Sequence, residues 1–413
     1  MPASPSLLIV PARFKTGKLY TQIATTSAGV VLASSGDFNV TRATTATRFN
    51  SAGLIESVAS GVPRLDYFTS GGTAGCPALL VEASGSNALS YSEEFDNAAW
   101  GKSAMTVSTG TTALFTAPDG TTNADKIIAT SGNVAHNINR SGIASAAYTF
   151  SVFAKAGEES VISLWLRGAS VKAEFNLVSG TVSNITTTSA RIENYGNGWY
   201  RCTVYDSTAG TTAHVYGRGG AAYAGNGSDG FYLWGAQLET GSVATSYIPT
   251  TTAAVTRNAD VVLVTGAVSG SIGQTQGTIY AEVDARNFTV NSRLISISNG
   301  TQSNRITTFF FGTNAIRLLA TVAGAGQVSI TSPSLSAGII KLAIGYALND
   351  YAFYVNGVQA GTSASALVPA CNAVILGSVD SLTGLAVMND RILAAALYTT
   401  RLSNAELAAL TSL

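Results

Sequence analysis

Residues 148–153 read Tyr-Thr-Phe-Ser-Val-Phe, and residues 199–205 read Trp-Tyr-Arg-Cys-Thr-Val-Tyr. In both stretches every second side chain is apolar, which gives an extended chain one face suited to a core. Clusters of glycine and asparagine separate runs of this kind along the chain, as turns between short strands do. The pattern predicts an all-β fold in which Tyr200, Cys202 and Val204 are buried together.

Composition divides the chain into four segments. All four tryptophans and both histidines lie within residues 87–250, which we expect to form an aromatic-rich jelly-roll domain. Residues 1–86 hold short strands and loops, and residues 251–270 are rich in small residues and are interpreted as a linker strand. Residues 271–413 form a second β unit. Strands without intervening helices predict two antiparallel β-sandwich domains in series after an N-terminal strand-and-loop segment.

The last unit carries two strong local signals. An Asn-Gly pair within Tyr351–Gln359 predicts a two-residue hairpin turn. Ser403 can cap a helix over Asn404–Leu410, with Glu406 three residues later completing a capping box. We therefore expect one short helix at the C-terminal end of an otherwise β chain.

Charge is sparse. Of the 413 residues, 11% are charged and the net charge at pH 7 is zero, whereas an average soluble domain is about 25% charged. Zero net charge gives no electrostatic case for nucleic acid or an anionic membrane. We expect no membrane insertion, because no run of about 18 apolar residues occurs. Uncharged polar faces suit subunits that bury surface against neighbours, which predicts an oligomer.

The three cysteines offer neither a disulfide framework nor metal-ligand spacing. Cys76, Cys202 and Cys371 are sparse and far apart. Buried free thiols fit a protein folded in a reducing cytosol. The residues after Met1 lack the basic and apolar regions of a secretory signal. These features predict synthesis in a cytoplasm.

Motifs in the first 250 residues occur in an order that resembles bacteriophage structural proteins. Residues 42–56, 62–67 and 78–83 resemble the N-terminal segment of many virion proteins. Gly198-Trp-Tyr-Arg-Cys and Trp234-Gly-Ala-Gln-Leu-Glu, which follow them, resemble motifs of the carbohydrate-binding-module-like jelly roll of phage tail fibres. The resemblance implies a jelly roll over residues 87–250 and a place in the virion for a chain made in the host cytoplasm.

The last 140 or so residues resemble a different module. Tyr354-Val-Asn-Gly, and Tyr398-Thr-Thr-Arg followed by the capped helix, resemble a concanavalin A-like sandwich of the laminin-G type. Together the resemblances imply a tail fibre or receptor-binding appendage that contacts host-surface glycan, with other virion proteins as partners and a homotrimeric assembly. The alternatives are a capsid decoration or head-fibre protein and, third, a polysaccharide depolymerase.

Attachment to the particle is expected within residues 1–86. The apolar run Leu7–Val10 is followed by Pro11, which can end strand pairing. An apolar strand near a terminus is an edge that needs a partner. It either pairs with a neighbouring virion protein by strand addition or pairs within its own chain.

A carbohydrate site is predicted around Trp165. On an extended chain Trp165 shares a face with Ser163 and Arg167, so an aromatic ring lies among polar side chains. Tyr216 and Tyr223 flank glycine-rich loops and could line the same site. The alternative for Trp165 is a core or subunit interface. These four residues, Trp165, Arg167, Tyr216 and Tyr223, are the candidate sugar contacts.

Catalytic and metal-binding signals are weaker. Glu158 and Glu159 are adjacent, so on a strand they point to opposite faces and do not form a catalytic pair. We therefore expect no enzyme activity. Asp119, Asp125 and Asp229, two of them beside glycine, could supply oxygen ligands to calcium, with ordinary turn aspartates as the alternative. Calcium is thus the one cofactor considered, and Trp234 is predicted to be core.

Overall fold

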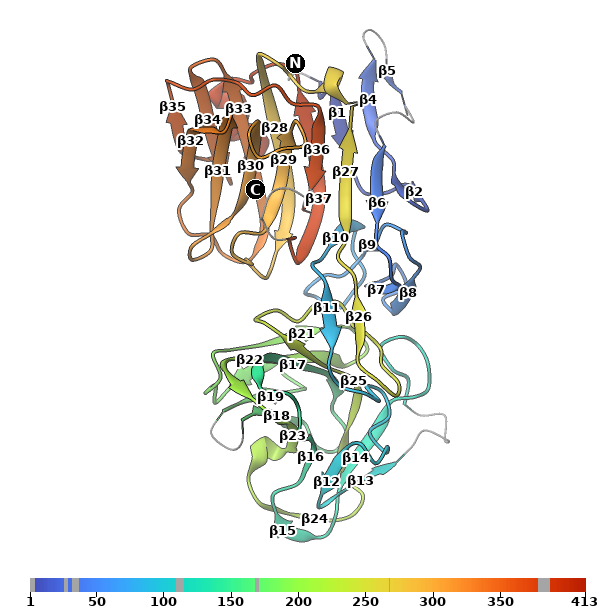
Figure 1. The fold of residues 1–413 in the computed structure, drawn as a ribbon. Coiled ribbons are helices and arrows are strands. Elements are labelled where there is room, and N and C mark those ends of the chain that lie inside the picture. Colours follow the sequence, from blue (N-terminus) through green and yellow to red (C-terminus); the bar gives the residue numbers. More distant parts are fainter. Residues whose placement is uncertain are drawn as a thin grey trace.

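The computed structural model describes residues 4–25, 29–31, 37–108, 115–167, 171–266, 268–377 and 387–413. Figure 1 shows two stacked β bodies, one built from both ends of the chain and one from its middle. Within these ranges the structure contains one α-helix, α1 (Asn404–Thr411), and Ser403 and Glu406 form its capping box. The all-β prediction with a short C-terminal helix is confirmed. No helix in the described ranges is long and apolar enough to cross a membrane.

The body at the chain ends, here called the terminal sandwich, has two antiparallel sheets. Its ten-stranded sheet has the order β35-β34-β33-β28-β37-β1-β4-β5, with β10 also on β37 and β9 on β10. These strands are β1 (Leu7–Ile9), β4 (Gln22–Thr25), β5 (Gly29–Val31), β9 (Leu65–Asp66), β10 (Ala78–Val81), β28 (Gln276–Ala285), β33 (Gly338–Ala347), β34 (Asp350–Val355), β35 (Val358–Ser363) and β37 (Asp390–Tyr398). Helix α1 packs on β33 and β34.

The second sheet of the terminal sandwich has nine strands in the order β2-β3-β6-β27-β36-β29-β30-β31-β32. They are β2 (Phe14–Lys15), β3 (Lys18–Leu19), β6 (Phe38–Thr41), β27 (Val261–Thr265), β29 (Arg293–Ser298), β30 (Arg305–Phe311), β31 (Ala315–Val322), β32 (Ala325–Thr331) and β36 (Ala373–Leu376). Side chains of both sheets, among them Leu7, Phe38, Ile279 and Leu376, share one core. A short 3₁₀ turn, η3 (Ser269–Ser271), follows β27.

The N-terminal residues are part of this body. The sequence predicts a separate segment over residues 1–86, but Leu7 pairs with Leu397 on β37 and β6 pairs with β27. Leu7 and Ile9 are fully buried. The apolar strand therefore pairs within the described chain and does not present a free edge. The hydrogen-bonded residues Ser6 and Leu397 are 391 positions apart in the sequence.

The middle body, here called the middle sandwich, is an insertion. The chain leaves the terminal sandwich along β11 (Gly85–Asn87) and returns along β26 (Val255–Arg257), and these strands pair with each other. Residues 251–270, predicted as a linker, are thus divided: β26 belongs to this two-stranded crossing, and β27 lies inside the nine-stranded sheet. In Figure 1 the crossing joins the two bodies.

The middle sandwich packs two six-stranded sheets against each other. The joint-side sheet has the order β13-β14-β25-β17-β22-β21 and the distal sheet has the order β12-β16-β23-β18-β19-β20. The joint-side strands are β13 (Met105–Ser108), β14 (Asp125–Ala129), β17 (Ala146–Lys155), β21 (Ser189–Asn194), β22 (Trp199–Gly210) and β25 (Gly230–Thr240). The distal strands are β12 (Gly101–Ser103), β16 (Asn137–Arg140), β18 (Val161–Leu166), β19 (Lys172–Asn176), β20 (Thr181–Ser183) and β23 (Ala213–Gly217), and β15 (Gly132–Val134) pairs with β24 (Tyr223–Gly225) at one end.

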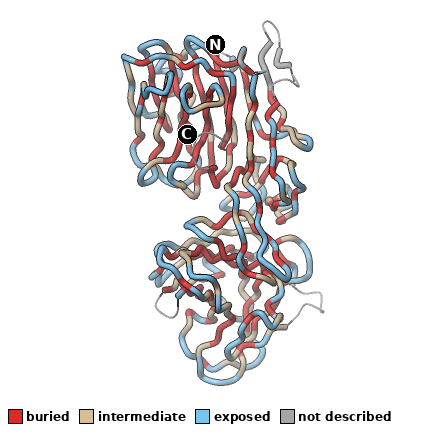
Figure 2. The backbone as a smooth tube through the Cα atoms, in the orientation of Figure 1, coloured by how far each residue is buried: buried red, intermediate tan, exposed pale blue. Residues whose placement is uncertain are grey.

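The predicted strands β17 and β22 are present, but burial does not alternate along them, because contacts at the joint cover the outer face as well and every residue of β17 from Tyr148 to Ala154 is buried. Cys202 and Val204 are fully buried between the sheets, and Tyr200 is half-buried against the same core. Figure 2 shows buried residues along the strands of both bodies, with exposed residues concentrated in the turns.

An aromatic cluster joins the two bodies. The hairpin of β7 (Ala46–Phe49) and β8 (Ile55–Val58) lies against the outer face of the joint-side sheet. The cluster contains Phe49, Ile55, Phe68, Phe153, Trp199, Trp234 and Tyr247, all buried. Trp234 is therefore core, as the sequence predicts. Two of the four tryptophans thus stabilise the joint.

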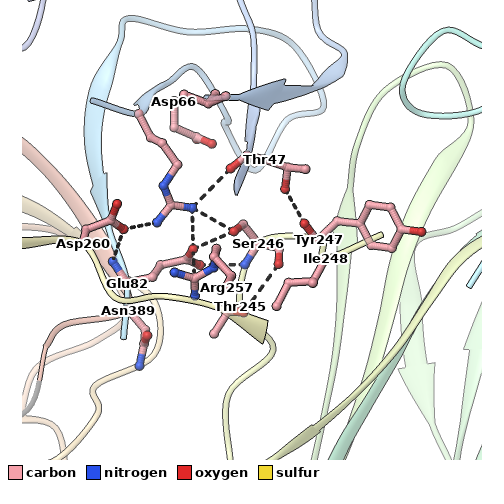
Figure 3. Close-up of polar contacts among 12 residues, drawn as sticks. Thr47, Asp66, Glu82, Thr245, Ser246, Tyr247, Ile248, Arg257, Asp260 and Asn389 are labelled. Atoms are coloured by element: carbon pink, nitrogen blue, oxygen red, sulfur yellow. Dashed lines mark hydrogen bonds and ion pairs between the residues drawn. The ribbon is translucent and has the colours of Figure 1, made fainter. Parts of the chain in front are cut away.

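A buried ionic network lies beside this cluster (Figure 3). Arg64 pairs with Asp260 and, at 2.6 Å, with Glu82; Arg42 also pairs with Asp260, at 2.9 Å. Glu82 further accepts hydrogen bonds from the backbone and hydroxyl of Ser246 in the middle sandwich, each 2.6 Å long. Burial alone would raise the pKa of Glu82, but the neighbouring arginines hold that pKa well below its usual range. The network ties the two sandwiches together.

Candidate ligand-binding face

The joint-side sheet turns its outer face to the β7–β8 hairpin, so the outward face of the distal sheet is on the other side of the middle sandwich. Successive side chains of β18 point to opposite faces of the distal sheet, and this alternation decides which residues lie on its outward face. Ile162, Leu164 and Leu166 of β18 point into the core, so Ser163 and Trp165 point outward. We call this outward surface the distal face.

Strand register brings aromatic side chains together on the distal face. Trp165 pairs with His214 on β23, and Ser163 pairs with Tyr216. The rings of Trp165 and Tyr216 stack with centroids 4.1 Å apart and planes inclined by 30°. His214 lies nearly parallel to Tyr216, with centroids 5.7 Å apart. Two of the predicted sugar contacts, Trp165 and Tyr216, are therefore neighbours in one row of three rings.

Hydrogen bonds fix the indole of Trp165. Its Nε1 donates to Oγ of Ser163 at 2.6 Å, and that hydroxyl donates to the carbonyl of Ala173 at 3.0 Å. The Lys172 ammonium lies 5.3 Å from the ring centroid, within the range of a cation–π contact. Trp165 is only 8% exposed. The accessible rings of the row are therefore the half-buried Tyr216 and His214.

A short turn, η2 (Arg218–Gly220), covers Trp165. A Cβ added at Gly220 would lie 2.3 Å from Cζ2 of the indole, so only glycine fits there. Gly219 accepts a hydrogen bond through its carbonyl from Lys172 at 3.3 Å. Arg218 reaches back to Glu159, with Nε 3.2 Å from the carboxylate. The glycine-rich stretch after β23 is thus a lid over the indole.

Amide groups border the ring row. Asn137 and Asn139 of β16 pair with Tyr216 and His214, and their amides are hydrogen-bonded to each other at 3.0 Å. Burial lowers the pKa of His214 and raises the pKa of Tyr216, so both rings are neutral near pH 7. Nδ1 of His214 has no hydrogen-bond partner in the described residues. Flat neutral rings with amide edges are suited to an uncharged, hydroxyl-rich ligand.

The other two predicted sugar contacts lie elsewhere. Strand β18 ends at Leu166 and Arg167 has a φ of 54°, so its side chain leaves the strand face and approaches Asp206 of the joint-side sheet at 3.5 Å. Tyr223 is 8% exposed and donates to Glu159 at 2.9 Å. Arg167 therefore does not share a face with Trp165, and Tyr223 anchors a loop.

The three predicted calcium ligands do not converge. Asp119 accepts from the backbone and hydroxyl of Thr121 within a turn. Asp125 is buried at the start of β14 and accepts from the backbone of Phe95 at 2.8 Å, whereas Asp229 lies opposite the other end of that strand. Among the described residues, no group of three or more His, Cys, Asp or Glu side chains is arranged to hold a metal ion.

The adjacent glutamates have separate partners. Glu158 is half-exposed and pairs with Lys126 at 2.8 Å. Glu159 is buried and accepts from Tyr223. Each carboxylate is thus engaged in its own contact, in line with the expectation that the pair does not converge.

No protein-family model matches this chain, and no match was found among curated proteins. Among solved structures, a carbohydrate-binding module (CBM40) of the Ruminococcus gnavus IT-sialidase is similar with 17% identity and a TM-score of 0.31, over 35% of this chain and 88% of that one. Domain 4 of the extracellular arabinanase AbnA from Geobacillus stearothermophilus is similar with 12% identity and a TM-score of 0.31, over 42% and 84%. A pentraxin from Limulus polyphemus is similar with 14% identity and a TM-score of 0.26, over 32% and 68%.

These neighbours include carbohydrate-binding modules and glycosidase domains. Identities and TM-scores of this size are too low for their ligands or activities to be transferred to this chain.

Proposed function

We propose that this chain is a non-catalytic glycan-binding component of a bacteriophage particle, such as a tail fibre, and that the distal face of the middle sandwich is its binding surface. The virion role rests on the sequence resemblance. The binding role rests on one observation, the row of Trp165, Tyr216 and His214 on an outward sheet face.

The geometry favours a sugar ring over other flat ligands. Tyr216 and His214 offer neutral aromatic area, and the amides of Asn137 and Asn139 beside them can donate to and accept from hydroxyls. Trp165 lies behind this surface and holds Tyr216 in place by stacking. A surface of this kind gives weak binding per site, which several copies in an oligomer would strengthen.

The arrangement of the two bodies supports the same role. The terminal sandwich and the joint hold the middle sandwich by one face, through the joint-side sheet. The distal face is thereby directed outward, as an adhesive surface needs to be. A homotrimer in which the terminal sandwiches assemble would present three such faces.

The test is glycan-array and host-cell binding by the full chain, with Tyr216→Ala and His214→Ala as variants. Loss of one stacking ring should cost about 1–2 kcal/mol, or roughly 5- to 30-fold in affinity. Tyr20→Ala is a matched control, because Tyr20 is a half-buried tyrosine in the terminal sandwich and should leave binding unchanged.

Two results would contradict the proposal. Absence of binding by the parent chain to any host surface or glycan would favour the capsid-decoration alternative, in which the sandwich is structural. Equal loss from Tyr20→Ala and Tyr216→Ala would show that the effect comes from overall stability and not from the distal face.

A further inference from the structure

A second concave site lies at the joint, on the opposite side of the middle sandwich from the distal face. It is a cleft of about 280 Å³ between the outer face of the joint-side sheet and the chain just after β28. Arg191 and Thr203 line it from β21 and β22, and Arg286 and Asn287 line it from the terminal sandwich. We call it the joint cleft. Neither sandwich forms it alone.

Strand register and domain contact hold its walls in place. Arg191 and Thr203 are direct cross-strand neighbours, so both side chains point out of the joint-side sheet toward the terminal sandwich. Nη1 of Arg191 lies 3.2 Å from Oδ1 of Asn287 and 3.5 Å from the carbonyl of Arg286. The guanidinium of Arg191 therefore connects the two walls.

One buried polar atom in the cleft lacks a partner. Thr203 is 8% exposed, and its Oγ1 makes no hydrogen bond to any described residue. Buried hydroxyls are almost always hydrogen-bonded, since leaving one unpaired forfeits its hydration. The oxygen itself is buried, so a rotation of the Thr203 side chain would turn this hydroxyl into the cleft, where an oxygen of a bound molecule would satisfy it.

The lining offers guanidinium donors to an anion. Two guanidiniums, from Arg191 and Arg286, line the cleft, and none of its described lining residues carries a carboxylate. Glu193 pairs with both arginines and Asp284 pairs with Arg286, and these two carboxylates lie outside the lining. Each guanidinium has five donors, so both can bind a further carboxylate oxygen without giving up these pairs.

We propose that the joint cleft binds a small hydroxylated carboxylate of the size of one sugar ring, a uronic acid. The volume is close to the lower end of small-molecule sites. The guanidiniums bind the carboxylate, and Thr203, with Tyr205 and Asn287, binds ring hydroxyls. The inference is independent of the distal face, because the two sites share no residue.

The experiment is calorimetric titration of the full chain with D-glucuronate, with D-glucose and acetate as reference probes. Glucuronate should bind at least tenfold more tightly than either probe, because glucose lacks the carboxylate and acetate lacks the hydroxyls. Thr203→Val removes the hydroxyl at nearly constant shape, and Arg191→Gln removes one cation. Each should weaken glucuronate binding about tenfold.

Controls separate this site from the distal face and from misfolding. Tyr216→Ala should leave glucuronate binding unchanged, whatever it does to glycan binding. Thermal melting of each variant shows whether the joint persists, and Thr203→Val is decisive if Arg191→Gln loosens it. The proposal is overturned if the parent chain does not bind glucuronate, if acetate binds equally well, or if Thr203→Val binds glucuronate as the parent does.

Discussion

Replacing Gly220 by alanine should lift the lid from Trp165. Gly220 has a φ of 83°, and an added Cβ would lie 2.3 Å from Cζ2 of the indole. The indole cannot retreat, because its Nε1 is bound to Ser163 and its ring is stacked on Tyr216. We therefore expect the turn Arg218–Gly220 to move outward.

The cost follows from two effects. An alanine held at positive φ costs about 1 kcal/mol, and forcing a methyl group into a filled space costs about 1–3 kcal/mol. Gly220→Ala should thus lower the free energy of unfolding by about 2–4 kcal/mol, or less if the lid opens fully. Gly227 is a matched control, since its φ is 77° and no atom lies within 4 Å of an added Cβ. Gly227→Ala should cost only about 1 kcal/mol.

The assay is urea denaturation together with acrylamide quenching of tryptophan fluorescence. Trp100, Trp199 and Trp234 are each at most 2% exposed, so newly quenchable emission would come from Trp165. Gly220→Ala should add such emission and Gly227→Ala should not. Equal destabilisation by the two substitutions, or unchanged quenching in Gly220→Ala, would refute the assignment of this turn as a lid.

Three further predictions concern stability. Arg64→Met should destabilise the chain in urea by about 3–5 kcal/mol, because it leaves Glu82 and Asp260 buried without their shared cation. The control Arg48→Met breaks a pair with the partly exposed Glu56 and should cost at most about 1 kcal/mol. Equal costs for the two variants would contradict a stabilising role of the buried network. Burial raises the pKa of Asp125 to about 7, so between about pH 4 and pH 7 the folded chain keeps a proton that the unfolded chain has lost. The free energy of unfolding should therefore fall as the pH rises through this range. Asp125→Asn should flatten that part of the pH–stability curve, and an unchanged slope would contradict the assignment of the effect to Asp125. Deleting residues 1–10 removes the buried Leu7 and Ile9, and the burial of each side chain stabilises the fold by about 1.5–3 kcal/mol. Calorimetry should therefore show a lower melting temperature for the terminal sandwich alone. An unaltered transition would mean that β1 contributes little to stability.

Local features of the fold could be predicted from the sequence because they depend on neighbouring residues. Alternation over residues 148–153 and 199–205 predicts strands that exist, and Ser403 with Glu406 predicts the helix that they cap. The partner of Leu7 could not be predicted, since alternation says which face is buried and not which strand lies beside it. The prediction of a separate N-terminal segment rests on composition, because residues 1–86 lack Trp and His and hold few apparent strands, and composition does not reveal that β1 lies between β4 and β37.

Some residues of the candidate site could likewise be predicted from the local sequence, and others could not. Trp165 could be predicted as pointing out of the sheet because it lies within β18, where the alternation of Ile162, Leu164 and Leu166 fixes the opposite face. Arg167 could not be placed, because the strand rule fails where the chain turns to positive φ after Leu166. Asn137 and Asn139 border the rings only through the register of β16 with β23, which no local pattern in the sequence encodes.

The pairing of Leu7 with Leu397 imposes an order on the events of synthesis. The ends of the middle sandwich meet at Gly85 and Arg257, so that module can fold as soon as β26 leaves the ribosome. The terminal sandwich cannot close until β37 is made, which at typical elongation rates is roughly 10–30 s later. Throughout that interval β1 has β4 as its available neighbour, and the edge that later pairs with β37 lacks its partner. Aggregation during expression should therefore begin at the N-terminal strand, and slower translation of the last third of the chain should increase it.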